Sequence, residues 1–320
     1  MNSIPERQKF LDMRISGWGI ALPERIVTND ELSQTLDTSN DWILERSGIA
    51  QRRIGGSTSS LAVEAGELAL ASAGVKPESI DLLILATTTP DDQVPATSSK
   101  VQHELGLSCG AMDINAACSG FVYSLITGCG FLQAGCNRIL VIGSETLSGI
   151  TDWEDRSTAI LFGDGAGAIV LESSSGGGKL LGWNLSSSGE LRDILHAPIG
   201  GNIYMEGREV FRKAVTAMTE SGKKAIANSG ISPNEISLVI PHQANIRIIE
   251  TSMKKLGIPF ERAVWVGDKT ANTSSASIPI ALGHALDNNQ IAENDLILLV
   301  GFGAGMTAAG AVIQWGEINV

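Results

Sequence analysis

One cysteine in the sequence is placed where a thiol can act as a nucleophile. Cys118 lies in the run NAACSGF at residues 115–121, where a predicted strand turns into a predicted helix. The positive end of a helix dipole stabilises a thiolate, and small neighbours let a substrate approach closely. A small buried packing residue is the alternative interpretation of the same position. Cys129 and Cys136 are expected to pack inside or at the end of that helix, and Cys109 has no evident activating neighbour.

Two further polar residues follow predicted elements in the second part of the chain. His242 comes directly after the predicted strand at 238–241, in the run PHQAN. Ligands meet parallel α/β sheets at the carboxyl ends of strands, so this position favours a functional role. Asn272 lies in KTANTSSASIP, where capping of the following helix is the simpler interpretation. The remaining histidines are expected in surface or core roles; they are His103, His196 and His284.

The elements that must position these residues alternate between short β-rich runs and longer helical stretches. Such alternation predicts an α/β architecture with parallel strand pairing. In the first part of the chain we expect strands at 81–86, 111–115, 138–142 and 166–171, and helices at 98–105 and 118–134. In the second part we expect strands at 238–241, 263–266 and 296–300, a helix at 245–256, and a small-residue loop and helix over 272–287.

The same order of elements occurs twice, which favours a duplication over the alternation common to all α/β chains. We expect one half at 1–175, of which residues 1–12 are an extension, and the other half at 176–320. The boundary is expected in the Ser/Gly run at 173–178, and the sequence leaves open whether Met1 or Met13 is the native start. Duplicated turns that face one another would bring Cys118 close to His242 and Asn272.

Composition excludes several classes of protein. The 320 residues include 23 Lys+Arg and 35 Asp+Glu, a net charge of −12, whereas nucleic-acid-binding proteins usually carry a basic stripe. No run approaches the ~20 apolar residues of a membrane-spanning helix, and the polar start MNSIPERQKFLDMR has no signal-peptide core, so a cytoplasmic location is expected. Four cysteines without a CxxC pair indicate neither a disulfide framework nor a zinc site.

Six runs, in order and over almost the whole chain, together resemble the β-ketoacyl-acyl-carrier-protein synthase III family, which has the thiolase fold. The runs are DTSNDWILERSGIAQRRI at 37–54, NAACSGF at 115–121, FGDGAGAIVL at 162–171, PHQANIRI at 241–248, ANTSSASIP at 271–279 and GFGAG at 301–305. The resemblance implies a duplicated five-layer αβαβα architecture. The internal repeat described above is what that fold requires.

The resemblance also implies a Cys–His–Asn site. Cys118 would attack an acyl-CoA thioester and become acylated, with the backbone N–H groups of Cys118 and Ala304 as the oxyanion hole. His242 and Asn272 would hydrogen-bond the thioester carbonyl of malonyl-acyl carrier protein while loss of CO2 leaves an enolate, whose carbanion attacks the acyl group. The family implies no metal and no cofactor, since the CoA thioester and malonyl-acyl carrier protein are substrates, and it implies a homodimer.

Binding residues for CoA come from the same resemblance. Trp42 and Arg156 would sandwich the adenine of CoA, while Arg46 and Asn245 would lie along its entry path. Without the family, a plain core aromatic is an equally good interpretation of Trp42.

A basic segment in this acidic chain is expected to steer an acidic partner. Residues 208–255 carry eight basic and four acidic side chains. The family's acidic carrier protein fits, with Arg212, Arg247 and Lys255 as docking candidates. Solvated helix faces are the alternative explanation for part of these charges.

The sequence departs from the family pattern at three positions. Ala271 stands where the family often has glycine before the asparagine, and Ala304 stands in the middle of the final Gly-rich turn; the backbone N–H groups survive both changes. Val94 stands where some members place a bulky aromatic that closes the acyl pocket of the partner subunit. The smaller Val94 side chain is expected to admit a longer or branched primer.

Initiation of fatty-acid synthesis, with acetyl-CoA as the expected primer, is the favoured function. The alternatives are a condensing or acyl-transferring enzyme of secondary metabolism and a non-catalytic thiolase-fold partner subunit; the presence of all three site residues speaks against the latter. Primer length, physiological acceptor and metabolic branch stay open at this point.

Overall fold

The computed structural model of the 320-residue chain describes residues 10–173 and 177–317. The expected boundary between residues 175 and 176 lies outside the described residues, as do residues 1–9 of the expected extension. The first strand among the described residues is β1 (Leu11–Asp12), which pairs with β9 (Lys179–Ser186), so the last two residues of the expected extension belong to a sheet.

Two five-stranded sheets form the frame of the molecule. The first has the order β2 (Arg14–Ala21), β8 (Asp164–Glu172), β7 (Arg138–Thr146), β5 (Leu82–Ala86), β6 (Gly110–Ile114). The second has the order β1, β9, β14 (Thr307–Gln314), β13 (Leu296–Gly303), β12 (Leu238–Pro241).

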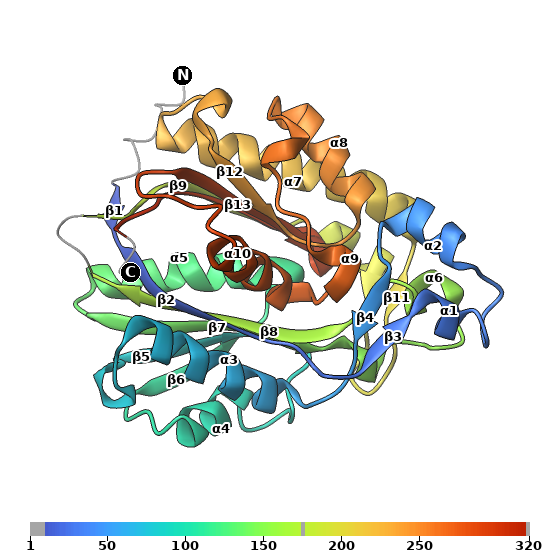
Figure 1. Cartoon of the computed structure of the whole chain (residues 1–320), viewed down its shortest axis with the longest axis horizontal. Coiled ribbons are helices and arrows are strands. Elements are labelled where there is room, and N and C mark those ends of the chain that lie inside the picture. The colour runs from blue at the N-terminus through green and yellow to red at the C-terminus, as the bar shows by residue number, and fades with distance from the viewer. Residues whose placement is uncertain (1–9, 174–176, 318–320) are drawn as a thin grey trace.

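Helices fill the three layers around these sheets (Figure 1). The long helix α7 (Gly207–Ser229) and α8 (Ile246–Leu256) cover the outer face of the second sheet. The other outer layer contains α3 (Thr58–Ala73) and α4 (Thr97–Glu104), and α5 (Gly120–Gln133) and α10 (Ser277–Asp287) lie between the sheets. The expected five-layer αβαβα order is confirmed.

The sequence of each helix explains its layer. Helix α8 buries Ile248, Ile249, Met253 and Leu256, which recur on one stripe, and its charged residues face outward. Helix α10 is apolar on nearly all sides, which is the pattern of a helix enclosed between two sheets.

The predicted internal repeat is confirmed by strand pairing. In both halves the strands pair antiparallel, antiparallel and then parallel, through β2–β8–β7–β5 and β9–β14–β13–β12. The parallel pairs have the same register, because Leu82 lies opposite Ile139 and Leu238 lies opposite Ile297. Helices α5 and α10 take equivalent places between the sheets.

The strand expected at 263–266 is wrong. Only one isolated bridge, between Val239 and Ala263, continues the second sheet beyond β12. The buried side chain of Gln243 explains the difference, since its Oε1 accepts the backbone N–H of Val266 at 2.8 Å and its Nε2 donates to the carbonyl oxygen of Val264 at 3.1 Å. A side chain therefore replaces the strand ladder here.

One helix start also differs from the expected one. The helix expected from residue 118 begins as a short 3-10 turn at Ala117–Ser119, which leads into α5. In the segment 272–287, expected as a loop and a helix, the 3-10 turn Ser274–Ala276 leads into α10. No residue range was predicted from the sequence for the helices α3 and α7, for the strands β2, β9 and β14, or for the short elements nearer the site. Those short elements are β3 (Ile26–Thr28), α1 (Asn29–Leu32), α2 (Asn40–Ser47), β4 (Gln51–Arg53), α6 (Arg156–Ala159), β10 (Leu195–His196), β11 (Tyr204–Met205) and α9 (Gly267–Thr270).

Within the described ranges, no helix combines the length and the apolar character needed to cross a membrane.

Candidate active site

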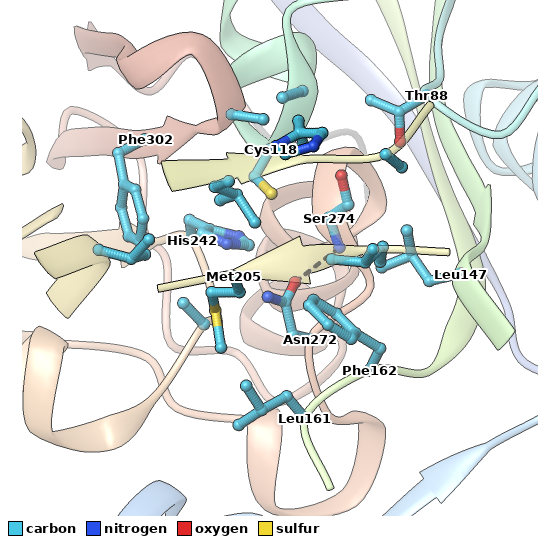
Figure 2. A pocket seen from close by; sticks show the side chains of 18 of the residues that line it. Thr88, Cys118, Leu147, Leu161, Phe162, Met205, His242, Asn272, Ser274 and Phe302 are labelled. Carbon is cyan, nitrogen blue, oxygen red and sulfur yellow. Dashed lines mark hydrogen bonds between the residues drawn. The ribbon is translucent and has the colours of Figure 1, made fainter. Parts of the chain in front are cut away.

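A cavity of about 340 Å³ opens where the two halves meet. Its wall brings together Cys118, His242, Asn272 and Ala304, four of the residues singled out from the sequence. Figure 2 shows the sulfur of Cys118, the imidazole of His242 and the amide of Asn272 around the same space. Apolar side chains form much of the rest of the wall, among them Leu147, Leu161, Phe162, Leu195, Ile203, Met205, Val210, Phe211, Ile248 and Phe302.

The turn that carries Cys118 is fixed by contacts from both halves. Asn115 Oδ1 accepts the backbone N–H of Ala117 at 3.2 Å, and this bond closes the turn. From the second half, Thr307 Oγ1 donates to the carbonyl oxygen of Ala116 at 2.9 Å, and Ser119 Oγ donates to the carbonyl oxygen of Thr307 at 3.1 Å.

The turn that carries Asn272 repeats this geometry. Asn272 Oδ1 accepts the backbone N–H of Ser274 at 2.8 Å, as Asn115 does in the other half, and Ser275 stands at the position equivalent to Cys118. Backbone bonds between Asn272 N and Leu161 O (2.9 Å) and between Gly163 N and Asn272 O (3.0 Å) hold the turn to the first half. Because the side-chain oxygen is used in the turn, the Nδ2 amide group is the donor that Asn272 offers to the cavity.

His242 is enclosed at the end of β12, with only 1% of its surface exposed. Its Nδ1 lies 2.6 Å from the hydroxyl oxygen of Ser277, and its ring contacts Phe302 edge-on with the ring centroids 5.5 Å apart. Burial lowers the pKa of His242 to about 3. The imidazole is therefore neutral at pH 7.

Cys118 is a thiol in the resting site. Burial raises the pKa of Cys118 to about 12; a hydrogen bond from Ser274 opposes this rise, while the nearby Glu145 adds to it. The stabilised thiolate expected from the start of a helix is thus not the resting form, because desolvation outweighs the favourable interactions.

A buried glutamate that was not singled out from the sequence lies behind the cavity. Glu145, at the end of β7, accepts hydrogen bonds from the backbone N–H of Thr88 (3.0 Å), from Thr89 Oγ1 (2.6 Å) and from Ser275 Oγ (2.8 Å). Thr88 lines the cavity and Ser275 is in the Asn272 turn, so Glu145 ties the two halves together beside the site.

The end of β13 packs closely against the nucleophile turn. A Cβ atom at Gly303 would lie 2.5 Å from the backbone nitrogen of Cys118, so only glycine permits this close approach. Ala304 follows and lines the cavity. The N–H groups of Cys118 and Ala304 remain the predicted oxyanion hole.

The residues expected to bind CoA lie together. Of these, Asn245 lines the cavity, whereas Trp42, Arg46 and Arg156 do not. The guanidinium carbons of Arg46 and Arg156 lie 4.0 and 4.7 Å from the centroid of the Trp42 ring. Asn245 caps α8 through Arg247 N, donates to the carbonyl oxygen of Arg46 at 2.8 Å and lines the cavity. At 4.7 Å, Arg156 leaves no room for an adenine ring against Trp42, so a sandwich requires this arginine to move.

The docking candidates are not equally close to the cavity. Arg247 lies over the cavity-lining Phe211, at 5.7 Å from its ring centroid, and Arg212 is the next residue along α7. Lys255 lies eight residues beyond Arg247 on α8, about 12 Å along the helix. All three side chains are exposed.

Val94 does not line the cavity of its own chain. It is 84% exposed and lies in the loop before α4. The expected contact of Val94 with the acyl pocket of the partner subunit stays a prediction.

Sequence reasoning missed three residues at or beside the site: Ser277, Glu145 and His196. His196 was expected in an ordinary surface or core role, but it lines the cavity. Ser277 lies within the run ANTSSASIP, and its position five residues after Asn272 was the available signal. Within residues 10–173 and 177–317, no group of three or more His, Cys, Asp or Glu is arranged to hold a metal.

Comparisons with known proteins cover both halves. Residues 112–189 match the family described as 3-oxoacyl-[acyl-carrier-protein (ACP)] synthase III, and residues 226–315 match its C-terminal family. A β-ketoacyl-[acyl-carrier-protein] synthase III of Erythrobacter litoralis is 45% identical over 316 residues, covering 94% of this chain and 98% of the relative.

Solved structures agree with these sequence matches. The 3-oxoacyl-[acyl-carrier-protein] synthase III of Aquifex aeolicus superposes with a TM-score of 0.93 at 43% identity, covering 95% of this chain and 100% of that one. The priming β-ketosynthase of the R1128 polyketide biosynthetic pathway has a TM-score of 0.89 at 33% identity, with 98% of each chain covered. The fold is thus the thiolase-like one, and the chain belongs to the β-ketoacyl-[acyl-carrier-protein] synthase III family of condensing acyltransferases.

Proposed function

We propose that this protein condenses an acyl-CoA primer, acetyl-CoA in the first instance, with malonyl-acyl carrier protein through an acyl-Cys118 intermediate, and so initiates fatty-acid synthesis. The observation that carries the proposal is the single cavity in which Cys118 from one half meets His242 and Asn272 from the other. The reaction needs no cofactor, since both substrates are activated thioesters.

In the first step, the Cys118 sulfur forms a bond to the acyl carbon and the bond from that carbon to the CoA sulfur breaks. The proton of the Cys118 thiol ends on the departing CoA. Negative charge develops on the acyl oxygen, where the N–H groups of Cys118 and Ala304 stabilise it. Both residues line the cavity, which supports this assignment.

In the second step, malonyl-acyl carrier protein loses CO2. The electrons of the broken carbon–carbon bond pass into an enolate, whose oxygen accepts hydrogen bonds from His242 and from the Asn272 Nδ2 group. The enolate carbon then attacks the acyl carbon, and the Cys118 sulfur leaves as a thiolate, which takes a proton from solvent. A neutral histidine and an amide suit this step because both donate hydrogen bonds without carrying charge.

CoA would enter past Trp42, Arg46, Arg156 and Asn245. In this proposal Arg156 moves away from the Trp42 ring, breaking its bonds to Asp37 O (2.5 Å) and Asp37 Oδ2 (3.5 Å), and the adenine enters between the two side chains. The exposed position of Asp37 makes this movement inexpensive.

The carrier protein would dock on the exposed basic residues beside the cavity, Arg212, Arg247 and Lys255. A homodimer would form through β6, the last strand of its sheet, so that the sheet continues into the partner subunit and Val94 approaches the acyl pocket of that subunit. The location of such an enzyme would be cytoplasmic. Sedimentation analysis at micromolar concentration is expected to give twice the chain mass, and a monomer would contradict the dimer proposal.

The function is tested with a panel of acyl-CoA primers and malonyl-acyl carrier protein, with the β-ketoacyl product measured by mass spectrometry. Product is expected with acetyl-CoA, and no product with Cys118→Ser. Cys136→Ser is the matched control, since this thiol lies after α5 away from the cavity, and it should keep wild-type activity. Full activity in Cys118→Ser would overturn the mechanism.

The same panel tests the primer range. Acceptance of C4–C8 acyl-CoAs supports the proposal that Val94 leaves the acyl pocket of the partner subunit open. Rejection of those primers with full use of acetyl-CoA would overturn it.

A second candidate is a condensing enzyme of secondary metabolism with the same residues. The similarity to the priming β-ketosynthase of the R1128 pathway favours it. Turnover with a polyketide-type carrier protein and not with a fatty-acid carrier protein would favour this candidate over the first.

A further inference from the structure

The imidazole of His242 has one nitrogen committed inside the protein. Nδ1 lies 2.6 Å from the hydroxyl oxygen of Ser277, the first residue of α10, and both residues have 1% of their surface exposed. The ring nitrogen left for the cavity is Nε2. Which nitrogen carries the proton therefore depends on the direction of the bond between Nδ1 and Ser277.

A second hydrogen bond indicates that direction. The backbone N–H of Gln243 donates to the same Ser277 oxygen, at 3.3 Å. The hydroxyl proton of Ser277 still needs an acceptor, and among the described residues the structure gives it His242 Nδ1. The chain thus runs from Gln243 N–H to Ser277 O–H to His242 Nδ1. A neutral imidazole that accepts at Nδ1 carries its proton on Nε2.

The duplicated half of the molecule offers an internal comparison. By strand register and turn geometry, Ala86 and Gly120 occupy the positions equivalent to His242 and Ser277. A Cβ atom at Gly120 would lie 3.3 Å from the Cβ of Ala86, so the two equivalent positions also adjoin in the first half. The first half therefore has no hydroxyl–imidazole pair at these positions. The pair occurs in the second half, where the imidazole faces the cavity. The start of α10 does not itself require a serine.

We propose that Ser277 is a positioning residue that holds His242 as the tautomer with N–H on Nε2, so that His242 serves as a hydrogen-bond donor and not as the base for Cys118. The inference rests on the proposed function. It assigns His242 to the decarboxylation step and not to the acylation of Cys118. During decarboxylation the Nε2–H group donates to the enolate oxygen, and no proton leaves the ring. The thiol proton of Cys118 goes to CoA and not to His242.

The tautomer is measured directly on the wild-type protein. Labelling with 15N-histidine gives a pair of ring-nitrogen signals, Nδ1 and Nε2, for each of the four histidines, and the pair missing from His242→Gln identifies His242. The expected spectrum has an unprotonated Nδ1 and a protonated Nε2 between pH 6 and 8. A protonated Nδ1 in that range would overturn the proposal.

Kinetics of the two half-reactions test the positioning role. Ser277→Ala is expected to slow release of 14CO2 from malonyl-acyl carrier protein by about 10- to 100-fold, since the donor loses its orientation. Transfer of a radiolabelled acyl group from acyl-CoA to Cys118 should stay within about twofold of wild type, because His242 is not the base in that step. Ser277→Thr keeps the hydroxyl and should restore CO2 release.

Ser252→Ala is the matched control. Ser252 is buried in α8, and its hydroxyl has no hydrogen-bond partner among the described residues, so its removal should change neither half-reaction. Melting temperatures show whether each variant folds. Equal loss of both half-reactions in a folded Ser277→Ala, or loss of neither, would overturn the inference. Failure of wild-type protein to release CO2 would instead overturn the proposed function, while the NMR result would still report the tautomer.

Discussion

At the level of single residues, burial sets the protonation state of Cys118 and His242, two of the titratable groups in the cavity. It raises the pKa of Cys118 to about 12 and lowers the pKa of His242 to about 3. Both groups are thus neutral in the resting site. A neutral thiol is less prone to react with solvent oxidants than a thiolate, so reactivity depends on the substrate that enters.

The resting thiol predicts how Cys118 reacts with iodoacetamide. Only the thiolate is alkylated, so the rate at Cys118 should rise about tenfold per pH unit between pH 7 and 10 without levelling off. Peptide mass spectrometry resolves Cys118 from the other thiols. A rate that is already constant below pH 8 would show a stabilised thiolate and contradict this assignment.

Backbone conformation at a second residue gives another prediction. Ala271, just before Asn272, has φ 58° and ψ −162°, a region that glycine adopts readily and alanine does not. Ala271→Gly should therefore raise the free energy of unfolding, by about 1 kcal/mol, measured by urea denaturation. Ala71→Gly, at an exposed position of α3, is the control and should lower it by a similar amount. A decrease in both variants would show that Ala271 is unstrained.

At the level of elements, one pair of equivalent positions differs between the two halves. β7 and β13 are equivalent strands, and Glu145 on the first corresponds to Gly303 on the second. The Glu145 carboxylate accepts a hydrogen bond from Ser275, whereas Gly303 carries no side chain and lets β13 approach the Cys118 turn closely. The two equivalent turns therefore have different neighbours, a carboxylate beside Ser275 and bare backbone beside Cys118.

Adding a side chain at Gly303 tests its role beside the Cys118 turn. In Gly303→Ala the new Cβ would lie 2.5 Å from Cys118 N and 2.7 Å from the Cβ of Ala117, so the nucleophile turn must shift. Acylation of Cys118 is expected to fall by about 100-fold, as for loss of an oxyanion donor. Gly130→Ala in α5 meets no atom within 4 Å and should keep full activity with unchanged or higher stability. Equal activity in the two variants would contradict the role of Gly303.

The sequence predicted the parts of the fold that follow local patterns. Apolar runs such as 82–86 and 238–241 were found as strands, and the repeat of their order led to the facing turns. The segment 263–266 was predicted as a strand but does not form one, because a side chain distant in sequence, Gln243, makes hydrogen bonds to its backbone. Glu145 and Ser277 could not be recognised from local patterns either, because their hydrogen-bond partners lie 130 and 35 residues away along the chain.

At the level of the whole molecule, the buried neutral His242 links stability to pH. Its pKa is about 3 in the folded protein and about 6.5 in an unfolded chain, so the unfolded state binds the extra proton between these values. The free energy of unfolding should therefore fall as pH drops below about 6.5, by at most about 1.4 kcal/mol per pH unit from this residue.

Comparison of wild type with His242→Gln isolates that contribution. Urea denaturation at pH 7, 6, 5 and 4 should show a shallower loss of stability in the variant than in the wild type. Parallel losses in the two proteins would mean that His242 titrates in the folded protein near its ordinary pKa.

The central claim is that the seam between the halves holds one reactive thiol, Cys118, which carries the primer before condensation. The most direct measurement is intact-protein mass spectrometry after mixing with acetyl-CoA, followed by addition of malonyl-acyl carrier protein. The account predicts one added acetyl group, mapped to Cys118, which disappears as β-ketoacyl-carrier protein forms. An unmodified protein that still forms product, or an acetyl group that malonyl-acyl carrier protein does not remove, would contradict it.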